Sequence, residues 1–128
     1  MRSARRAEPG VRGVSSLAYV ICEAQDGGPW RAEARFLVSS GRDLRALLEG
    51  AGLADRGHPP DLSATVRGDL VMEDRPVSGH TALTAADLAV LVSLTSPAEQ
   101  PRLRAWQAFA GALEASERSV RLIVWFVG

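Results

Sequence analysis

The sequence predicts an α+β fold with two helices packed on one face of an antiparallel sheet. Three observations support this prediction: strict alternation over residues 30–38, helical apolar spacing over 44–51 and 103–113, and a strongly apolar segment at 120–127. The elements follow the β-α-β-β-α-β order of a ferredoxin-like sandwich, preceded by an extra N-terminal edge strand. A β-grasp-like or irregular α+β arrangement is the alternative.

The first two predicted strands form a hairpin. Residues 17–24 (LAYVICEA) are short, branched and almost entirely apolar. The Asp26-Gly27 step that follows supplies the positive φ of a tight turn. Beyond the turn, apolar and charged residues alternate, which is typical of a strand with one buried and one solvated face. The apolar positions are Trp30, Ala32, Ala34, Phe36 and Val38.

A helix is predicted after the hairpin. Ser40 has the position of an N-cap, and Asp43 follows three residues later. Gly52 offers a left-handed stop, and the two prolines of residues 54–60 (ADRGHPP) indicate a loop. The apolar face of the helix consists of Leu44, Leu47, Leu48 and Ala51.

The middle of the chain fits more than one structure. Residues 62–67 alternate and predict a third strand that continues to residue 72, and residues 75–82 are predicted to be a loop. In residues 84–95, Thr84 and Asp87 are placed to cap a helix, but the length and the branched content favour a buried strand, which is our prediction.

The last two predicted elements are a helix and a strand. Ser96 and Glu99 have the spacing of a capping box, but Pro101 moves the expected start of the helix to Gln100 or Pro101. The helix is expected to end near Ser116. Residues 120–127 (VRLIVWFV) then form a strand that we expect at the centre of the sheet, with both faces covered.

Length and composition indicate one folded domain. The chain has 128 residues, 46% hydrophobic and 23% charged, which is ordinary for a globular domain. We place a mobile basic tail at residues 1–13 and a single α+β domain at residues 14–128. The longest stretch without charge or histidine, residues 88–98, is shorter than the ~20 residues of a membrane-spanning helix. No membrane partner is expected, and a single cysteine without a secretory signal favours the cytoplasm.

The charge distribution makes specific nucleic-acid binding unlikely. All 15 basic residues are Arg, and the chain has neither Lys nor Asn, a bias that predicts a coding sequence from a GC-rich bacterium or its phage. The tail carries +3 and the rest of the chain −3, so there is no concentrated basic surface for phosphate contacts. Without Lys, Schiff-base chemistry is excluded.

No established catalytic, nucleotide-binding or metal-binding motif occurs in the chain. The weak catalytic candidates are His58 and His80, because imidazoles alone have an unperturbed pKa near neutrality. Both fall in predicted loops. Asp69, Glu73 and Asp74 lie between them, but the spacing fits no pattern of metal ligands. We predict no metal and no cofactor.

Two further polar residues lie in the first predicted strand. Cys22 has no neighbouring cation or helix N-terminus, so we expect a small buried hydrophobe rather than a nucleophile. Glu23 is expected to be solvated at the end of the strand, with a lone acid in a pocket as the alternative.

Four residues are weak candidates for binding. Tyr19 and Trp106 are placed to line a cavity between sheet and helices, although core packing is the expected role of the aromatic residues. Arg102 and Arg104 begin the last helix, where the helix dipole disfavours cations. This placement indicates either an external anionic partner or nearby acids, and we expect nearby acids.

These observations favour a small non-catalytic binding or assembly module, whose partner is a second copy of the chain or another protein. A small sheet with an exposed edge and an apolar terminal strand often hides that surface in an oligomer. The alternative is a small-molecule enzyme or ligand carrier with a cavity between sheet and helices. A cavity of about 300 Å³ or more reached by either imidazole favours the enzyme, and two fully solvated histidines exclude it.

Overall fold

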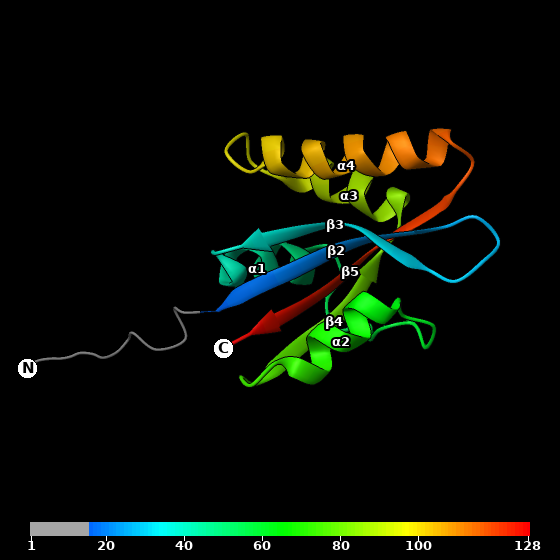
Figure 1. Cartoon of the computed structure of the whole chain (residues 1–128). Helices are drawn as coiled ribbons and strands as arrows, with labels where there is room; N and C mark the ends of the chain where they lie inside the picture. The colour runs from blue at the N-terminus through cyan, green and yellow to red at the C-terminus, as the bar shows by residue number, and fades with distance from the viewer. Residues whose placement is uncertain (1–15) are drawn as a thin grey trace, which may run out of the picture.

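Four antiparallel strands form one sheet in the computed structural model, which describes residues 16–128 (Figure 1). The strand order is β3-β2-β5-β4, so the last strand along the chain pairs with the first. The predicted tail at residues 1–13 lies outside the described residues. The strands are β2 (Leu17–Gln25), β3 (Arg31–Val38), β4 (Val77–Leu83) and β5 (Ser119–Val127).

Helices cover both faces of the sheet. In Figure 1, α3 and α4 lie together on one side of the sheet and α2 lies on the other. Residues Leu44 and Leu48 of α1 belong to the same apolar cluster as α3 and α4, which places α1 on their side. The helices are α1 (Gly41–Gly50), α2 (Ala64–Met72), α3 (Ala85–Leu94) and α4 (Gln100–Ala115).

The predicted α+β class with an antiparallel sheet is confirmed, whereas the ferredoxin-like detail is not. Residues 16–128 hold four helices rather than two, and α2 lies on the face opposite to the others. The hairpin, α1, the start of α4 at Gln100 and the final strand agree with the prediction. The segments whose secondary structure differs from the prediction all lie between residues 62 and 95, and the position of β2 in the sheet also differs.

Helix α2 occupies the segment that we predicted as a third strand. Its N-cap is Ser63, whose side chain accepts a hydrogen bond from Val66 N–H at 3.2 Å. The backbone N–H of Ser63 donates to the carboxylate of Glu23 at 2.7 Å. Leu62, Val66 and Leu70 pack on the sheet at intervals of four residues, which is helical spacing. The strand prediction was wrong because so short an apolar pattern fits both the helical and the strand period. The contact between Ser63 and Glu23 cannot be seen in the sequence.

Residues 84–95 are also helical, so the strand prediction was wrong here and the capped helix is correct. Asp87 N–H donates to the Thr84 hydroxyl at 3.1 Å, and Thr84 N–H donates back to the Asp87 carboxylate at 2.9 Å. Leu88, Leu91 and Val92 form the buried face of α3. The high apolar content that favoured a strand includes exposed residues of α3, Val90 and Leu94, as well as its buried face, so local periodicity does not reveal the helix.

Strand β4 lies where we predicted a loop. The pairing of β4 with β5 shifts register between Ser78 and Thr81, so the strand contains a bulge. Gly79 lies in this bulge with a φ of +67°, and a Cβ atom there would lie 2.5 Å from Cδ1 of Phe126. The glycine therefore permits both the backbone conformation and the close approach to β5.

Strand β2 is an inner strand, which corrects its predicted position as an added edge strand. It pairs with β5 along its whole length, from Leu17 opposite Val127 to Gln25 opposite Ser119. The prediction failed because the residues of β2 pair with residues 94 to 110 positions away in the chain. Strand β5 is an inner strand as predicted, and the edges of the sheet are β3 and β4.

Both edges of the sheet are protected from further pairing. Along β4, Gly57 N–H donates to the His80 carbonyl at 2.7 Å, and the Thr81 hydroxyl donates to the Leu53 carbonyl at 2.6 Å. The loop after α1 therefore covers this edge. Along β3, the pairing with β2 contains a bulge opposite Cys22, and the strand has three charged side chains, features that disfavour edge-to-edge pairing.

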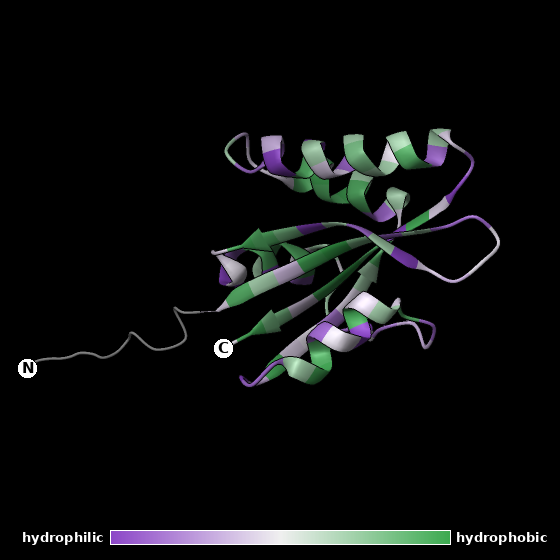
Figure 2. Cartoon of the chain, in the orientation of Figure 1, coloured by the Kyte–Doolittle hydropathy of each residue, from purple (hydrophilic) through white to green (hydrophobic). Residues whose placement is uncertain are grey.

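The two faces of the sheet differ in composition. The first face, toward α1, α3 and α4, holds a large apolar cluster that includes Val20, Leu91 and Phe126. The second face, toward α2, holds a smaller apolar cluster and the buried carboxylate of Glu23. Figure 2 shows hydrophilic and hydrophobic residues mixed along α2. None of the helices within residues 16–128 has the length and hydropathy needed to cross a bilayer.

Candidate functional site

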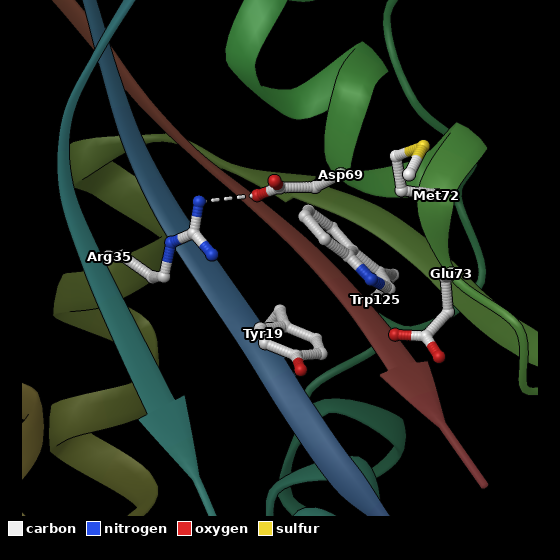
Figure 3. A pocket seen from close by; sticks show the side chains of 6 residues that line it. All are labelled: Tyr19, Arg35, Asp69, Met72, Glu73 and Trp125. Carbon is white, nitrogen blue, oxygen red and sulfur yellow. Dashed lines mark ion pairs between the residues drawn. The ribbon is translucent and has the colours of Figure 1, made fainter.

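A cavity of about 190 Å³ lies on the second face, where the end of α2 meets β2, β3 and β5 (Figure 3). Strands β2, β3 and β5 each contribute one side chain to this cavity. Helix α2 contributes two, and Glu73, the residue after it, contributes one. We call it the α2 cavity. It is lined by Tyr19, Arg35, Asp69, Met72, Glu73 and Trp125.

Two stacked aromatic rings form the floor of the α2 cavity. Tyr19 and Trp125 are direct partners in the pairing of β2 with β5, so both side chains lie on the second face. Their ring centroids are 5.4 Å apart and the planes are inclined by 27°. Trp125 is only 1% exposed, whereas Tyr19 is half-buried. The floor is therefore a fixed aromatic surface with a polar edge.

Two ion pairs border the α2 cavity. Arg35 Nη2 lies 2.6 Å from Asp69 Oδ2 across the gap between β3 and α2. On the other side, the Arg75 guanidinium donates to Glu73 at 3.0 Å and the Arg75 backbone N–H donates to the same oxygen at 3.1 Å. These bonds hold the pKa of Glu73 below its ordinary value. The Glu73 carboxylate therefore remains ionised and paired with Arg75 at neutral pH.

Two buried polar atoms at the α2 cavity have no hydrogen-bond partner among the described residues. The first is the indole Nε1 of Trp125. The second is Asp69 Oδ2, whose ion pair with Arg35 lacks the geometry of a hydrogen bond. Figure 3 shows the indole nitrogen on the side of the ring toward Glu73. Buried polar groups in proteins are nearly always hydrogen-bonded. An unsatisfied N–H beside a cavity therefore indicates that the cavity accommodates an acceptor.

A second polar cluster lies on the same face, around Glu23. Its carboxylate is fully buried and accepts from Arg121 Nε at 2.7 Å, so the expectation of a solvated strand end was wrong. Arg121 also donates to Asp61 and lies over the Trp30 ring, 3.8 Å from its centroid. The Trp30 indole N–H donates to Asp61 at 3.1 Å. A hollow of about 530 Å³ borders this cluster, and the Trp30 indole N–H, the Asp61 carboxylate and the Arg67 guanidinium that line it are already hydrogen-bonded.

The two histidines lie next to each other but away from the α2 cavity. His58 is in a loop as predicted, whereas His80 is in β4 and not in a loop. Their ring centroids are 4.5 Å apart, and His58 Nε2–H donates to the Val124 carbonyl at 2.8 Å. Burial lowers the pKa of His58, although the Val124 carbonyl opposes this shift. Both rings are half-buried, so the histidines are not fully solvated.

Neither imidazole lines the α2 cavity or three further cavities within residues 16–128, which have volumes of about 530, 350 and 240 Å³. Asp69 and Glu73 line the α2 cavity. His58 instead lies beside the Trp125 ring, and the centroids of these two rings are 6.0 Å apart. Within the described part of the chain, no group of three or more His, Cys, Asp or Glu side chains is placed to hold a metal ion.

Cys22 is buried in β2 as expected for a small hydrophobe. Burial, and to a smaller extent Glu33 and Glu23, raises the pKa of its thiol to about 11. At neutral pH the thiol is therefore protonated and unreactive.

The remaining binding candidates are dispersed over the fold. Trp106 is buried in the first face, where its ring stacks on Phe36 with centroids 5.7 Å apart. Arg102 forms an ion pair with Glu99 at 3.1 Å. Arg104 is an exposed residue of α4. Tyr19 is the one binding candidate from the sequence that lines the α2 cavity.

Sequence reasoning missed the other residues of the α2 cavity. From the sequence, Arg35 was expected on the solvated face of the alternating strand, and Trp125 was expected to pack in the core. No local signal joins them, because the face that they share is set by strand pairing, in which Tyr19 lies opposite Trp125 and Arg35 lies opposite Ile21. Met72 required the correct assignment of α2 as a helix.

Comparison with known proteins gives no match: no family model matches the chain, and no curated protein and no solved structure matches it.

Proposed function

We propose that this chain is a non-catalytic module that binds a small molecule in the α2 cavity. The observation that supports this most directly is the buried indole N–H of Trp125, which has no acceptor among the described residues. A ligand that offers an acceptor to this group removes the free-energy penalty of leaving it unsatisfied. The free protein is thus prepared to gain a hydrogen bond on binding.

Binding is better supported than catalysis by the state of the titratable groups. Asp69 and Glu73 are each engaged by an arginine, so neither is a free general base. His58 donates its Nε2–H to a backbone carbonyl and lines none of the four cavities. The high pKa of Cys22 leaves no thiolate. No pair of groups therefore combines the geometry and the protonation state of an acid and a base.

Nitrogen-15 NMR with a library of small fragments tests the proposal, because the indole N–H of each tryptophan gives a separate signal. We expect fragments that move the Trp125 signal at millimolar concentration or below. The signal of Trp106, which is buried on the first face, remains unchanged. If no fragment moves the Trp125 signal, the proposal is overturned.

Two neighbouring residues of α2 provide a blocking variant and its control. Met72 lines the cavity and Val71 does not, yet both are highly exposed, at 78% and 81%. We expect Met72→Phe to fill the mouth of the cavity and to abolish the fragment-induced shifts. Val71→Phe adds a similar apolar ring outside the cavity and leaves the shifts in place. Equal effects of both variants would show that the fragments bind elsewhere.

Self-association remains a separate proposal. Strand β5 offers no free surface, because it is paired on both sides and covered on both faces. The apolar side chains available to a second copy include Val71 and Leu94, which is 58% exposed. Light scattering at high micromolar concentration tests this, and a particle of 13.6 kDa would contradict it. A bacterial or phage origin and a cytoplasmic location likewise remain predictions from composition.

A further inference from the structure

The charges around the α2 cavity are already balanced inside the protein, which restricts the ligand that it accepts. Arg35 neutralises Asp69, and Arg75 neutralises Glu73. A cationic or anionic ligand must compete with one of these ion pairs or bring an uncompensated charge into a half-closed site. A neutral ligand requires neither change. The electrostatics of the cavity therefore favour an uncharged molecule.

The hydrogen-bonding groups of the α2 cavity require both an acceptor and a donor from the ligand. The Trp125 indole N–H needs an acceptor. Asp69 Oδ2 lies 2.6 Å from Arg35 Nη2, and Glu73 Oε1 accepts only one long bond of 3.4 Å from Arg75. Carboxylate oxygens have capacity for further bonds. An adjacent C=O and N–H, as in an amide, match this combination.

The size of the α2 cavity limits the ligand to a single small ring or its equivalent. Its volume of about 190 Å³ is below the 300–1,000 Å³ that is typical of drug-sized ligands. Tyr19 and Met72 add an aromatic face and a polarisable sulfur to the wall. A flat ring has apolar contact with these two side chains while its polar edge faces Trp125.

We propose that the α2 cavity binds a neutral cyclic amide, a class that includes lactams and pyrimidine-type heterocycles. The amide oxygen accepts from the Trp125 indole N–H, and the amide N–H donates to Glu73 or Asp69. This inference rests on the proposed function and specifies its ligand class. A site built around such polar groups rejects analogues that lack one of the two hydrogen bonds, because a buried group is then left unpaired.

A set of five-carbon probes tests the ligand class. The first probe, δ-valerolactam, is neutral and offers both an acceptor and a donor. Cyclopentanone is neutral and offers an acceptor only. At neutral pH, pentanoate is an anion and piperidine is a cation. Dissociation constants are read from the Trp125 indole signal. We expect the lactam to bind at least about five-fold more tightly than each of the other three, the range of one hydrogen bond. Equal or tighter binding of cyclopentanone, pentanoate or piperidine would overturn the assignment.

N-methyl-δ-valerolactam tests the donor without any change in the protein. It keeps the amide oxygen and loses the N–H, so we expect binding weaker than that of δ-valerolactam by about five-fold. In Glu73→Leu or Asp69→Leu, whichever removes the residue that accepts the N–H, this preference for the unmethylated lactam is lost because no acceptor remains. The matched control is Asp74→Leu, at an exposed residue that does not line the cavity, where the preference is retained. If neither variant alters the preference, neither carboxylate accepts a hydrogen bond from the amide N–H, and the assignment is overturned.

Failure of this inference is distinguishable from failure of the proposed function. If fragments move the Trp125 signal but the lactam is not preferred, the cavity binds ligands of another class. If neither the fragment library nor any of the five-carbon probes moves that signal, both proposals are overturned. Thermal unfolding of each variant beforehand shows whether it is folded, and the comparison of δ-valerolactam with its N-methyl form needs no variant.

Discussion

The two faces of the sheet differ in their covering helices and in their polar content, although the same two inner strands contribute side chains to both. The first face is covered by α1, α3 and α4 and is filled by apolar side chains. The second face is covered by α2 and by the loop that precedes it, and it holds the Glu23 cluster, the histidine pair and the α2 cavity. In β2 and β5 this contrast arises from side chains one position apart. The first face therefore supplies most of the hydrophobic stabilisation, and the second holds the buried polar groups.

Arg121→Met tests whether the second face depends on its polar cluster. The substitution leaves the fully buried Glu23 carboxylate without its cation, and we expect a loss of about 3–5 kcal/mol in the free energy of unfolding. Urea denaturation measures this loss. In Glu23→Gln/Arg121→Met no buried charge remains, so most of the stability returns. A double variant as unstable as the single one would show that the arginine acts through packing.

Truncation of matched leucines compares the packing of the two faces. Leu91 is fully buried on the first face, so Leu91→Ala is expected to lower the free energy of unfolding by about 3 kcal/mol. Leu70 is only half-buried on the second face, and Leu70→Ala is expected to lower it by about 1 kcal/mol. Denaturation in urea ranks the two variants. A reversed order would mean that α2 contributes more to stability than the three helices opposite.

Gly79→Ala tests the bulge through which β4 joins the sheet. The methyl group meets Phe126 at 2.5 Å in a backbone with a φ of +67°, so we expect a loss of about 2 kcal/mol. Gly111 is the control, because a Cβ atom on this helical glycine of α4 contacts nothing. Gly111→Ala is expected to raise the melting temperature, corresponding to about 0.5–1 kcal/mol. Equal shifts of the two melting temperatures would rule out a special role of the bulge.

The pH dependence of stability tests the burial of His58. Its pKa is lowered in the folded protein, so the unfolded chain takes up a proton first as the pH falls below about 6.5. The free energy of unfolding is therefore constant above this pH and decreases below it, until the native pKa is also passed. Urea midpoints at pH 7.5 and 5.5 measure the effect. In His58→Gln, which keeps a donor for Val124, the difference between the two midpoints becomes smaller. An unchanged difference would assign the dependence to other groups.

Local patterns in the sequence predict the elements whose signals are strong and complete within a few residues. The alternation of β3, the apolar spacing of α1 and α4 and the apolar run of β5 identify the class of fold and most of its core. The period-2 alternation was misleading at α2, where Leu62, Val66 and Leu70 also fit a helix. At β4, Gly79 resembles a turn residue and is in fact part of a bulge.

The candidate site was harder to predict than the fold because it depends on long-range pairing. Tyr19 was recognised as a cavity residue, but its neighbours across the sheet were not, since strand register is set by contacts far apart in the chain. The buried state of Glu23 also depends on partners distant in sequence, Ser63 and Arg121. No local signal in residues 17–24 contains this information.

The pairing of β5 with β2 has a kinetic consequence. Side chains of β5 contribute to both apolar clusters, so neither face of the sheet is complete until this strand is in place. During synthesis, the hairpin, α3 and α4 emerge earlier with their apolar surfaces uncovered. Contacts over such large sequence separations slow folding, because the entropy of loop closure is lost before they form. The chain is therefore expected to fold slowly in one cooperative step and to need protection from aggregation until β5 is available.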